Sequence, residues 1–445
     1  MICPSRCEAV FTALRRIEPS MVLELLGRHF FDTALLMVVK DRSANATYPD
    51  ADLSREESQQ KAMSDFYMIY KLIFLLTGIL PSLLLAKIGD RGWRRVPIVV
   101  SLGGSLMSTV ILLLVVLFRL PLEVMFGAAA LFGLSGGFAA FWSGVMTLAS
   151  LGSTPADRSK VLMRVELLYG ITGLVGSLVS GHLFQLDNSN LGKGTLLLSL
   201  GTLMNLLCFL HSALLLQVKQ VTNQEPEEDC QILSQESSDA TTEAPAGMNK
   251  VNMALLFTAA ALYVTAVGGA MEILSVFVMK APLSWTAAQV GYEKAAGCMI
   301  FITSFLGVVV FRRCVSESVL IMIGMVSFAS GIFFMSFVTE TYMFYLARSL
   351  NMFALIPMAT IRSLLSQQVP ASSCGITLTS LQVSLRFAGL AYIPAFTKIY
   401  QKTLSWFPGF IFTLSATITV LAMIPISIFG CRSPQRREYD RIQGE

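Results

Sequence analysis

Hydrophobic residues in this chain are gathered into long runs separated by short polar segments. A helix needs about 20 apolar residues to cross the hydrocarbon core of a bilayer. Runs of about that length occupy approximately residues 19–39, 66–88, 96–118, 123–149, 162–186, 194–217, 251–279, 288–311, 317–338, 341–366, 373–399 and 407–430. The pattern predicts an all-α membrane protein with twelve transmembrane helices.

A polar segment divides these runs into two sets of six. It carries four acidic residues at 225–229 and is rich in Ser, Thr and Gln, which predicts a disordered cytosolic linker. Two bundles joined by a linker is the arrangement of transporters that hold a substrate between their halves. The predicted domains are an N-terminal tail (1–18), a first six-helix bundle (19–217), the linker (218–250), a second six-helix bundle (251–430) and a C-terminal tail (431–445).

Composition narrows the classes of protein that the chain can belong to. Hydrophobic residues make up 54% of it and charged residues 14%, whereas soluble domains carry about a quarter charged residues. The net charge of +4 is small, so a nucleic acid polymer is not expected as a partner. The eight cysteines lack paired spacing, and we expect neither a metal site nor a bound cofactor. No phosphate loop surrounds Gly192–Lys193, which argues against an enzyme and against ATP-driven pumping.

Basic residues in the short loops predict the orientation, because Lys and Arg are retained on the cytosolic side. They place both termini in the cytosol. The loop from Lys40 to Asp65 then lies on the opposite side, and it contains the glycosylation acceptor triplet Asn45-Ala46-Thr47. The basic residues that share the cytosolic side are Arg91, Arg94, Arg95, Arg158, Lys160, Arg312, Arg313, Arg432, Arg436, Arg437 and Arg441.

The loop after the second predicted helix, Gly89-Asp90-Arg91-Gly92-Trp93-Arg94-Arg95, resembles the signature loop of the major facilitator superfamily. The resemblance implies a gating role, in which Asp90 pairs with basic partners such as Arg91, Arg94 and Arg95 near helix ends. The glycine falls two residues after Asp90, where the superfamily usually has it at three. A basic loop that only sets the topology is the alternative.

Longer segments resemble the proton-coupled folate transporter family, solute carrier family 46, and within it the thymic stromal cotransporter branch. The matching runs are FGAAALFG from Phe126, FAAFWSGVM from Phe138, IFITSFLGV from Ile300, IMIGMVSF from Ile321 and ETYMFYLAR from Glu340. The resemblance implies a symporter that imports folates, antifolates, muropeptides or cyclic dinucleotides together with protons. We expect a monomer in the plasma membrane, with the endolysosomal membrane as the alternative.

Charged residues inside the predicted helices mark candidate sites, because each costs about 2.5–3.5 kcal/mol to insert at a helix centre. The first helix carries Glu24, Arg28 and Asp32 at a spacing of four. We interpret Asp32 as a candidate proton site, and an internally neutralised ladder is the alternative. The adjacent pair Glu293–Lys294 is expected to be self-neutralised or interfacial.

Two glutamates are the main candidates for proton coupling. Glu166, in the fifth predicted helix beside Arg164, matches a glutamate that the family uses for coupling, although a pair with Arg164 is the alternative. Glu272 lies mid-way along the seventh helix, where the family also has an acid. Folate carriers of the family have a histidine five residues earlier, and this chain has Val267 there.

The resemblance also implies residues that bind the substrate. Arg362 matches an arginine of the family, with the cytosolic end of a helix as its alternative role, and Arg386 adds positive charge in the same half. A guanidinium group binds carboxylate or phosphate through two parallel hydrogen bonds. In the fourth helix, Phe141, Trp142 and Ser143 are candidates for an aromatic wall, with simple packing as the alternative. The small residues Gly173, Ser177 and Gly181 predict a close helix contact.

A membrane receptor or scaffold without transport activity is the alternative function that the sequence leaves open. For a transporter we expect acid-stimulated uptake that is lost in Glu166→Gln, because the amide cannot carry a proton. Uptake by vesicles at pH 5.5 checks this, and undiminished uptake in the variant would exclude Glu166 as the coupling site.

Overall fold

The computed structural model describes residues 17–44, 54–151, 158–187, 194–216, 250–280, 282–311, 315–367 and 371–432. Asn45, most of both predicted tails and residues 218–249 of the predicted linker lie outside the described residues. The elements of the described part are all helical. They are α2 (Glu18–Arg42), α3 (Arg55–Asp90), α4 (Val96–Leu117), α5 (Val124–Leu134), α6 (Gly137–Leu151), α7 (Arg158–Leu186), α8 (Thr195–Leu210), the π-helical turn η1 (His211–Leu215), α10 (Lys250–Phe277), α11 (Ala287–Phe311), α12 (Glu317–Met335), α13 (Thr341–Leu350), α14 (Ile356–Gln367), α15 (Ala371–Thr403) and α16 (Phe410–Arg432).

The predicted all-α membrane fold is confirmed. Within the described ranges, nine helical spans are long and apolar enough to cross a membrane. The other predicted spans coincide with α2, with α15 and with the pair α13 and α14. Of these, α2 carries Glu24, Arg28 and Asp32 in its middle, and the α13–α14 span is divided into two shorter helices.

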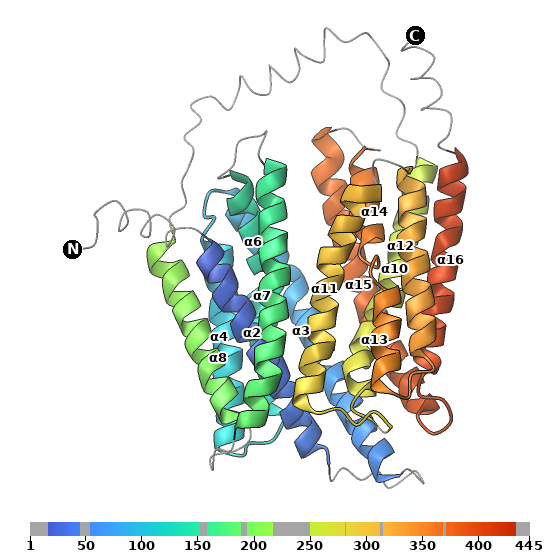
Figure 1. Ribbon diagram of the computed structural model, residues 1–445. Helices are drawn as coiled ribbons and strands as arrows, with labels where there is room; N and C mark the ends of the chain where they lie inside the picture. Colours follow the sequence, from blue (N-terminus) through green and yellow to red (C-terminus); the bar gives the residue numbers. More distant parts are fainter. Residues whose placement is uncertain are drawn as a thin grey trace, which may run out of the picture.

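The helices form two groups that stand side by side (Figure 1). In the first group α2 packs on α7 and α8, and α4 packs on α5, α6 and α8. In the second group α10 packs on α15 and α16, and α12 packs on α13, α14 and α16. The groups touch mainly through α7 against α11 and through α3 against α15. We refer to the groups as the first and second halves.

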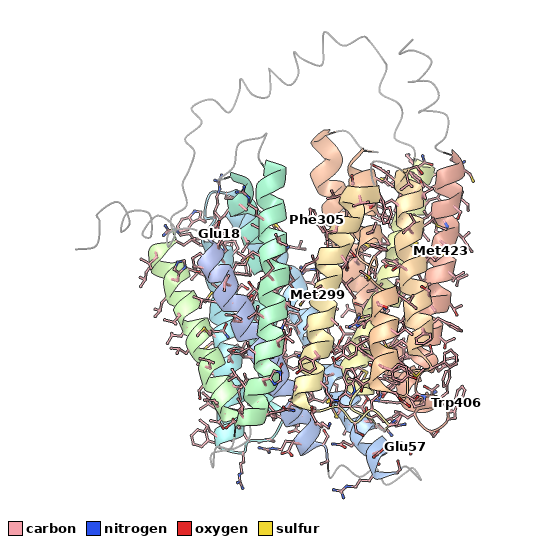
Figure 2. All side chains as sticks on the ribbon, viewed as in Figure 1. Glu18, Glu57, Met299, Phe305, Trp406 and Met423 are labelled. Atoms are coloured by element: carbon pink, nitrogen blue, oxygen red, sulfur yellow. The ribbon has the colours of Figure 1, made fainter. Side chains whose placement is uncertain are left out.

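The two ends of the bundle are named by residues labelled in Figure 2. Glu57 in the first turn of α3 and Trp406 after α15 lie at one end, which we call the Glu57 end. Glu18, the first residue of α2, lies toward the opposite end, which we call the Glu18 end. Helices α3 and α15 therefore run antiparallel, and the start of α3 meets the end of α15.

The contact between α7 and α11 depends on small residues, as the sequence predicted. A Cβ atom added to Gly181 would lie 2.7 Å from the carbonyl oxygen of Ala287, and one added to Gly173 would lie 2.8 Å from the Cys298 sulfur. On the facing helix, a Cβ on Gly291 would lie 2.6 Å from the Ser177 carbonyl oxygen. Backbones this close leave no room for a larger side chain.

Two predicted spans are interrupted within the bundle. The fourth is divided into α5 and α6 at Gly136 and Gly137, whose φ angles of 82° and 55° only glycine adopts readily. The tenth is divided at residues 351–355. Backbone groups in that break are bonded by side chains of other helices: Tyr263 donates to the Ala354 carbonyl, and Ser304 to the Met352 carbonyl at 2.9 Å. Hydrogen bonds from side chains to these backbone carbonyl groups allow a helix to be interrupted within the membrane.

Candidate functional site

A cavity of about 620 Å³ lies between the two halves of the molecule. Its volume falls within the range of about 300–1,000 Å³ that is typical of sites for drug-sized ligands. The first half contributes residues of α2, α3, α4, α5 and α6, and the second half contributes residues of α10, α14 and α15. Because both halves form its walls, the cavity changes shape if the halves move relative to each other.

Cationic side chains outnumber acidic ones in the cavity wall. Arg28, Lys71, Arg362 and Arg386 face two acids, Asp32 and Glu272. The structure therefore brings together four residues that the sequence singled out, Asp32, Glu272, Arg362 and Arg386, although they come from α2, α10, α14 and α15. A wall with an excess of positive charge favours an anionic solute.

Lys71 and Glu272 form an ion pair that joins the halves. Lys71 lies on α3 and Glu272 on α10, and both line the cavity. In the sequence the pair is hidden, because its members are separated by 201 positions. Nothing in the sequence pattern singles out Lys71 as the partner of Glu272, and the family's histidine position, Val267, gives no sign of it.

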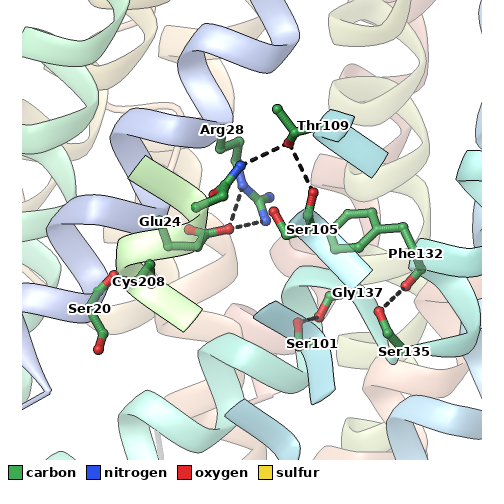
Figure 3. Close-up of polar contacts among 11 residues, drawn as sticks. Ser20, Glu24, Arg28, Ser101, Ser105, Thr109, Phe132, Ser135, Gly137 and Cys208 are labelled. Carbon is green, nitrogen blue, oxygen red and sulfur yellow. Dashed lines mark hydrogen bonds and ion pairs between the residues drawn. The ribbon is translucent and has the colours of Figure 1, made fainter. Parts of the chain in front are cut away.

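Arg28 forms an ion pair with the carboxylate of Glu24, which lies behind the cavity wall. Its Nη2 and Nε atoms donate to Oε1 of Glu24 at 2.6 Å and 3.0 Å (Figure 3). Glu24 is only 1% exposed, whereas the next residue of the ladder, Asp32, is exposed in the cavity wall. The guanidinium carbon also lies 3.8 Å from the centre of the Phe138 ring. The predicted ladder is thus divided into an ion pair whose carboxylate is buried and an acid, Asp32, that faces the cavity.

Arg362 and Arg386 approach the cavity from different helices of the second half. Arg362, on α14, has an exposed side chain in the wall, beside the Gln382 of α15. Arg386, on α15, is half-buried and donates from Nη1 to the hydroxyl of Ser82 on α3. Both guanidinium groups therefore lie where a solute between the halves would contact them.

The aromatic residues expected to form a wall lie behind it. Phe141 is 1% exposed, and Trp142 stacks on Phe138 with ring centres 5.8 Å apart and meets Tyr169 edge-on at 5.1 Å. Of this segment, Phe138 and Ala139 line the cavity, whereas Phe141, Trp142 and Ser143 do not. The other aromatic lining residues, which the sequence analysis did not identify, are Phe31, Tyr70, Phe74, Phe132 and Tyr392.

Glu293 belongs to a buried ion pair in the second half. Its Oε1 atom accepts from Nη2 of Arg348 at 2.9 Å, and the two side chains are 7% and 6% exposed. Ser275 of α10 donates to the other carboxylate oxygen at 3.3 Å. The expectation that Glu293 is neutralised by Lys294 or lies at an interface is therefore wrong, because its partner comes from α13.

The remaining predicted positions lie away from the cavity or outside the described part. The side chains of Glu166 on α7 and Asp90 at the end of α3 are outside the described residues. Arg91 is exposed, and Arg94 and Arg95 are half-buried at the Glu18 end. Gly92 between them has a φ angle of 101°. This turn needs a glycine two residues after Asp90, which accounts for the shifted position of the glycine.

Beyond the cavity, polar contacts join the halves at the Glu57 end. Lys398 of α15 donates to Asp65 of α3 at 2.7 Å. Gln401 donates to the same carboxylate at 2.9 Å and to the Ser64 hydroxyl at 2.8 Å. Lys40 of α2 donates to the carbonyl oxygen of Trp285, just before α11, at 3.1 Å. In this conformation the halves are therefore held together at the Glu57 end.

Comparison with known proteins agrees with this architecture. No protein-family model matches the chain. Solute carrier family 46 member 2 of Canis lupus familiaris is 39% identical over 462 residues, which cover 96% of this chain and 95% of that protein. This chain belongs to solute carrier family 46. The carrier is also 25% identical, over 87% of its length and 84% of its relative's, to the human lysosomal proton-coupled steroid conjugate and bile acid symporter SLC46A3.

Solved structures confirm the major facilitator fold of the carrier. The D-xylose–proton symporter superposes with a TM-score of 0.66 at 13% identity, covering 92% of this chain and 97% of that one. The human organic anion transporter MFSD10 superposes with a TM-score of 0.61 at 13% identity, with the same coverage. The predicted resemblance to the superfamily and to family 46 is confirmed.

The buried pair predicts a stability effect. Glu293→Ala should lower the free energy of unfolding by about 3 kcal/mol, because it leaves the Arg348 charge buried without its partner. The double variant Glu293→Leu/Arg348→Met should recover most of the loss, since it removes both charges. Denaturation of the purified carrier in detergent measures both.

The matched control is Glu340→Gln, which removes an exposed carboxylate at the N-terminus of α13 and should change stability by about 0.5 kcal/mol or less. Equal stability of Glu293→Ala and the parent carrier would contradict the structural role of this pair.

Proposed function

We propose that this carrier is a proton-coupled symporter that imports bulky organic anions by alternating access through the cavity between its halves. The observation that carries the proposal is the cavity wall, in which four cations from both halves face two carboxylates. The cations supply charge for an anion. The carboxylates, Asp32 and Glu272, are groups that can take up and release a proton in contact with the solute.

The size and the aromatic lining of the cavity support a bulky solute with rings. A volume of about 620 Å³ holds a molecule of the size of a folate or a cyclic dinucleotide. Phe31, Tyr70, Phe74, Phe138 and Tyr392 line it and offer ring faces for stacking. The candidate substrates are folates and antifolates, muropeptides and cyclic dinucleotides. Steroid conjugates and bile acids are further candidates, because the relative SLC46A3 is a proton-coupled symporter of these compounds.

The orientation follows from the basic loops. We place the Glu57 end outside the cytosol and the Glu18 end, with Arg91, Arg94 and Arg95, inside. Contacts such as Lys398–Asp65 then close the carrier toward the outside. The carrier is expected to act as a monomer in the plasma membrane, or in the endolysosomal membrane, where the lumen is acidic.

The proton gradient supplies enough free energy for accumulation. The inward movement of one proton through a membrane potential of about 100 mV releases about 2.3 kcal/mol of free energy. Each pH unit of the gradient adds about 1.4 kcal/mol. Two protons moving with one dianion cancel its charge, so the pH gradient then drives the accumulation of the anion.

Arg362 is predicted to contribute to anion binding. Arg362→Gln should raise the KM for an anionic solute about tenfold or more, because a charge-assisted contact contributes about 1.5–3 kcal/mol. Arg432→Gln, at the exposed end of α16, is the matched control and should leave the KM unchanged.

The assay is uptake by proteoliposomes after a pH jump, with a folate, a muropeptide, a cyclic dinucleotide and taurocholate as solutes. Acid-stimulated uptake of at least one of them is expected. Binding without uptake would instead indicate a receptor, and equal KM values for Arg362→Gln and the parent carrier would remove Arg362 from the site.

A further inference from the structure

The ion pair between Lys71 and Glu272 differs in its position from the other ion pairs of the described residues. Arg28–Glu24 and Arg348–Glu293 each lie within one half, and Lys398–Asp65 joins the halves outside the cavity lining. Lys71–Glu272 joins the halves and lines the cavity. A movement that separates the halves at this level must therefore break it.

The pair lies between the cavity and the contacts that close the Glu57 end. Lys71 follows Asp65 by six residues on α3, a distance of about 9 Å along a helix. Glu272 also lines a small space together with Ser64 and Thr397, which lie beside the closing contacts. Opening of the Glu57 end withdraws α3 from α10 and α15, and Lys71 then needs another negatively charged partner.

Water and protons reach both members of this pair, whereas the carboxylate of the Arg28–Glu24 pair is buried. The side chains of Lys71 and Glu272 are 38% and 21% exposed, whereas the Glu24 side chain, which holds Arg28, is 2% exposed. The titratable and charged groups that share the spaces lined by Glu272 are Lys71, Tyr70 and Tyr67 from α3, Tyr392 and Arg386 from α15, Arg28 and Asp32 from α2, and Arg362 from α14. Of these, Lys71 is the one in an ion pair with Glu272.

We propose that Lys71 exchanges partners during transport, binding the anionic group of the solute while Glu272 is protonated and returning to Glu272 after the proton has left. This exchange rests on the proposed function and makes Lys71 the group that couples the proton to the anionic solute. The proton adds to a carboxylate oxygen of Glu272 and later returns to water, and no covalent bond of the solute changes. The structure shows the state in which Glu272 holds Lys71.

The exchange links the proton and the anion through competition. The ionised Glu272 and the solute compete for the same ammonium group, so protonation of Glu272 tightens anion binding, and by reciprocity the bound anion favours protonation. Proton and anion therefore enter together. Loss of the proton toward the cytosol restores the competitor and expels the anion on that side.

Equilibrium binding to the purified full-length carrier tests the exchange. Taurocholate and a cyclic dinucleotide are the probes, because their sulfonate and phosphodiester groups stay ionised between pH 5.5 and pH 7.5. Glu272→Gln should lower the Kd at pH 7.5 about tenfold, to near the value of the parent carrier at pH 5.5, because it removes the competitor. Lys71→Met should raise the Kd about tenfold at pH 5.5 and should make it independent of pH, because the competition for Lys71 is then absent.

The decisive comparison is the double variant. In the Lys71→Met background, Glu272→Gln should leave the Kd unchanged, whereas Lys71→Arg should keep tight binding and thereby show that Lys71→Met acts through charge and not through misfolding. Asp65→Asn is the matched control, since it removes a carboxylate from the other ion pair between the halves and should preserve the pH dependence of the Kd.

The outcomes separate the inference from the proposed function. If Glu272→Gln tightens binding equally without Lys71, or if Lys71→Met binds the probes like the parent carrier at pH 5.5, the partner exchange is excluded while anion transport stands. If the parent carrier neither binds nor takes up any of the solutes, the proposed function fails, and the inference fails with it.

Discussion

Charged side chains within a bilayer must be paired with an opposite charge or must face water, and this constraint governs the arrangement of the whole carrier. Glu293 and Arg348 satisfy it by burial as a pair in the second half, and the buried Glu24 satisfies it by pairing with the cavity-lining Arg28 in the first half. Asp32 and Arg362 satisfy it by facing the cavity. Lys71 and Glu272 satisfy it in both ways, since they are paired and also line the cavity. The charges that face the cavity, as distinct from the buried ones, therefore mark where water and solute enter the protein.

The same constraint explains how the two halves are held together. Small residues bring α7 and α11 into backbone contact through Ser177, Gly181 and Gly291. Among the described residues, polar contacts between the halves include Lys398–Asp65, Lys71–Glu272 and Arg386–Ser82, and the hydrogen bond between His182 and Tyr292 in the α7–α11 contact. The close contacts between small residues of α7 and α11 allow one helix to roll on the other. Each polar contact, in contrast, must be broken and replaced when the halves move. The polar contacts are thus the places where a proton or an anion can bias the conformation.

The sequence predicted what depends on local pattern. Apolar runs located each span, and the small residues of α7 were expected at a helix contact because their spacing places them on one face. The break at Gly136 and Gly137 also has a local signal, two adjacent glycines, although a continuous helix was expected there. The break at residues 351–355 has little such signal, because Ser304 and Tyr263 from distant helices stabilise it.

The ion pairs of Glu272 and of Glu293 could not be predicted from the sequence. The pairing of Lys71 with Glu272 and of Glu293 with Arg348 depends on tertiary contacts, which the spacing of residues along the chain does not show. The cavity-lining role of Phe138, in place of Phe141 and Trp142, depends on how α6 is rotated after the break.

Simultaneous recording of solute uptake and luminal pH most directly tests the claim that the cavity moves an organic anion together with a proton. Proteoliposomes containing the parent carrier and a pH-sensitive dye are given a cyclic dinucleotide or taurocholate outside at pH 5.5. The account predicts that the solute enters and that its addition acidifies the lumen, in a fixed ratio of protons to anions. Solute entry without any additional acidification would contradict it.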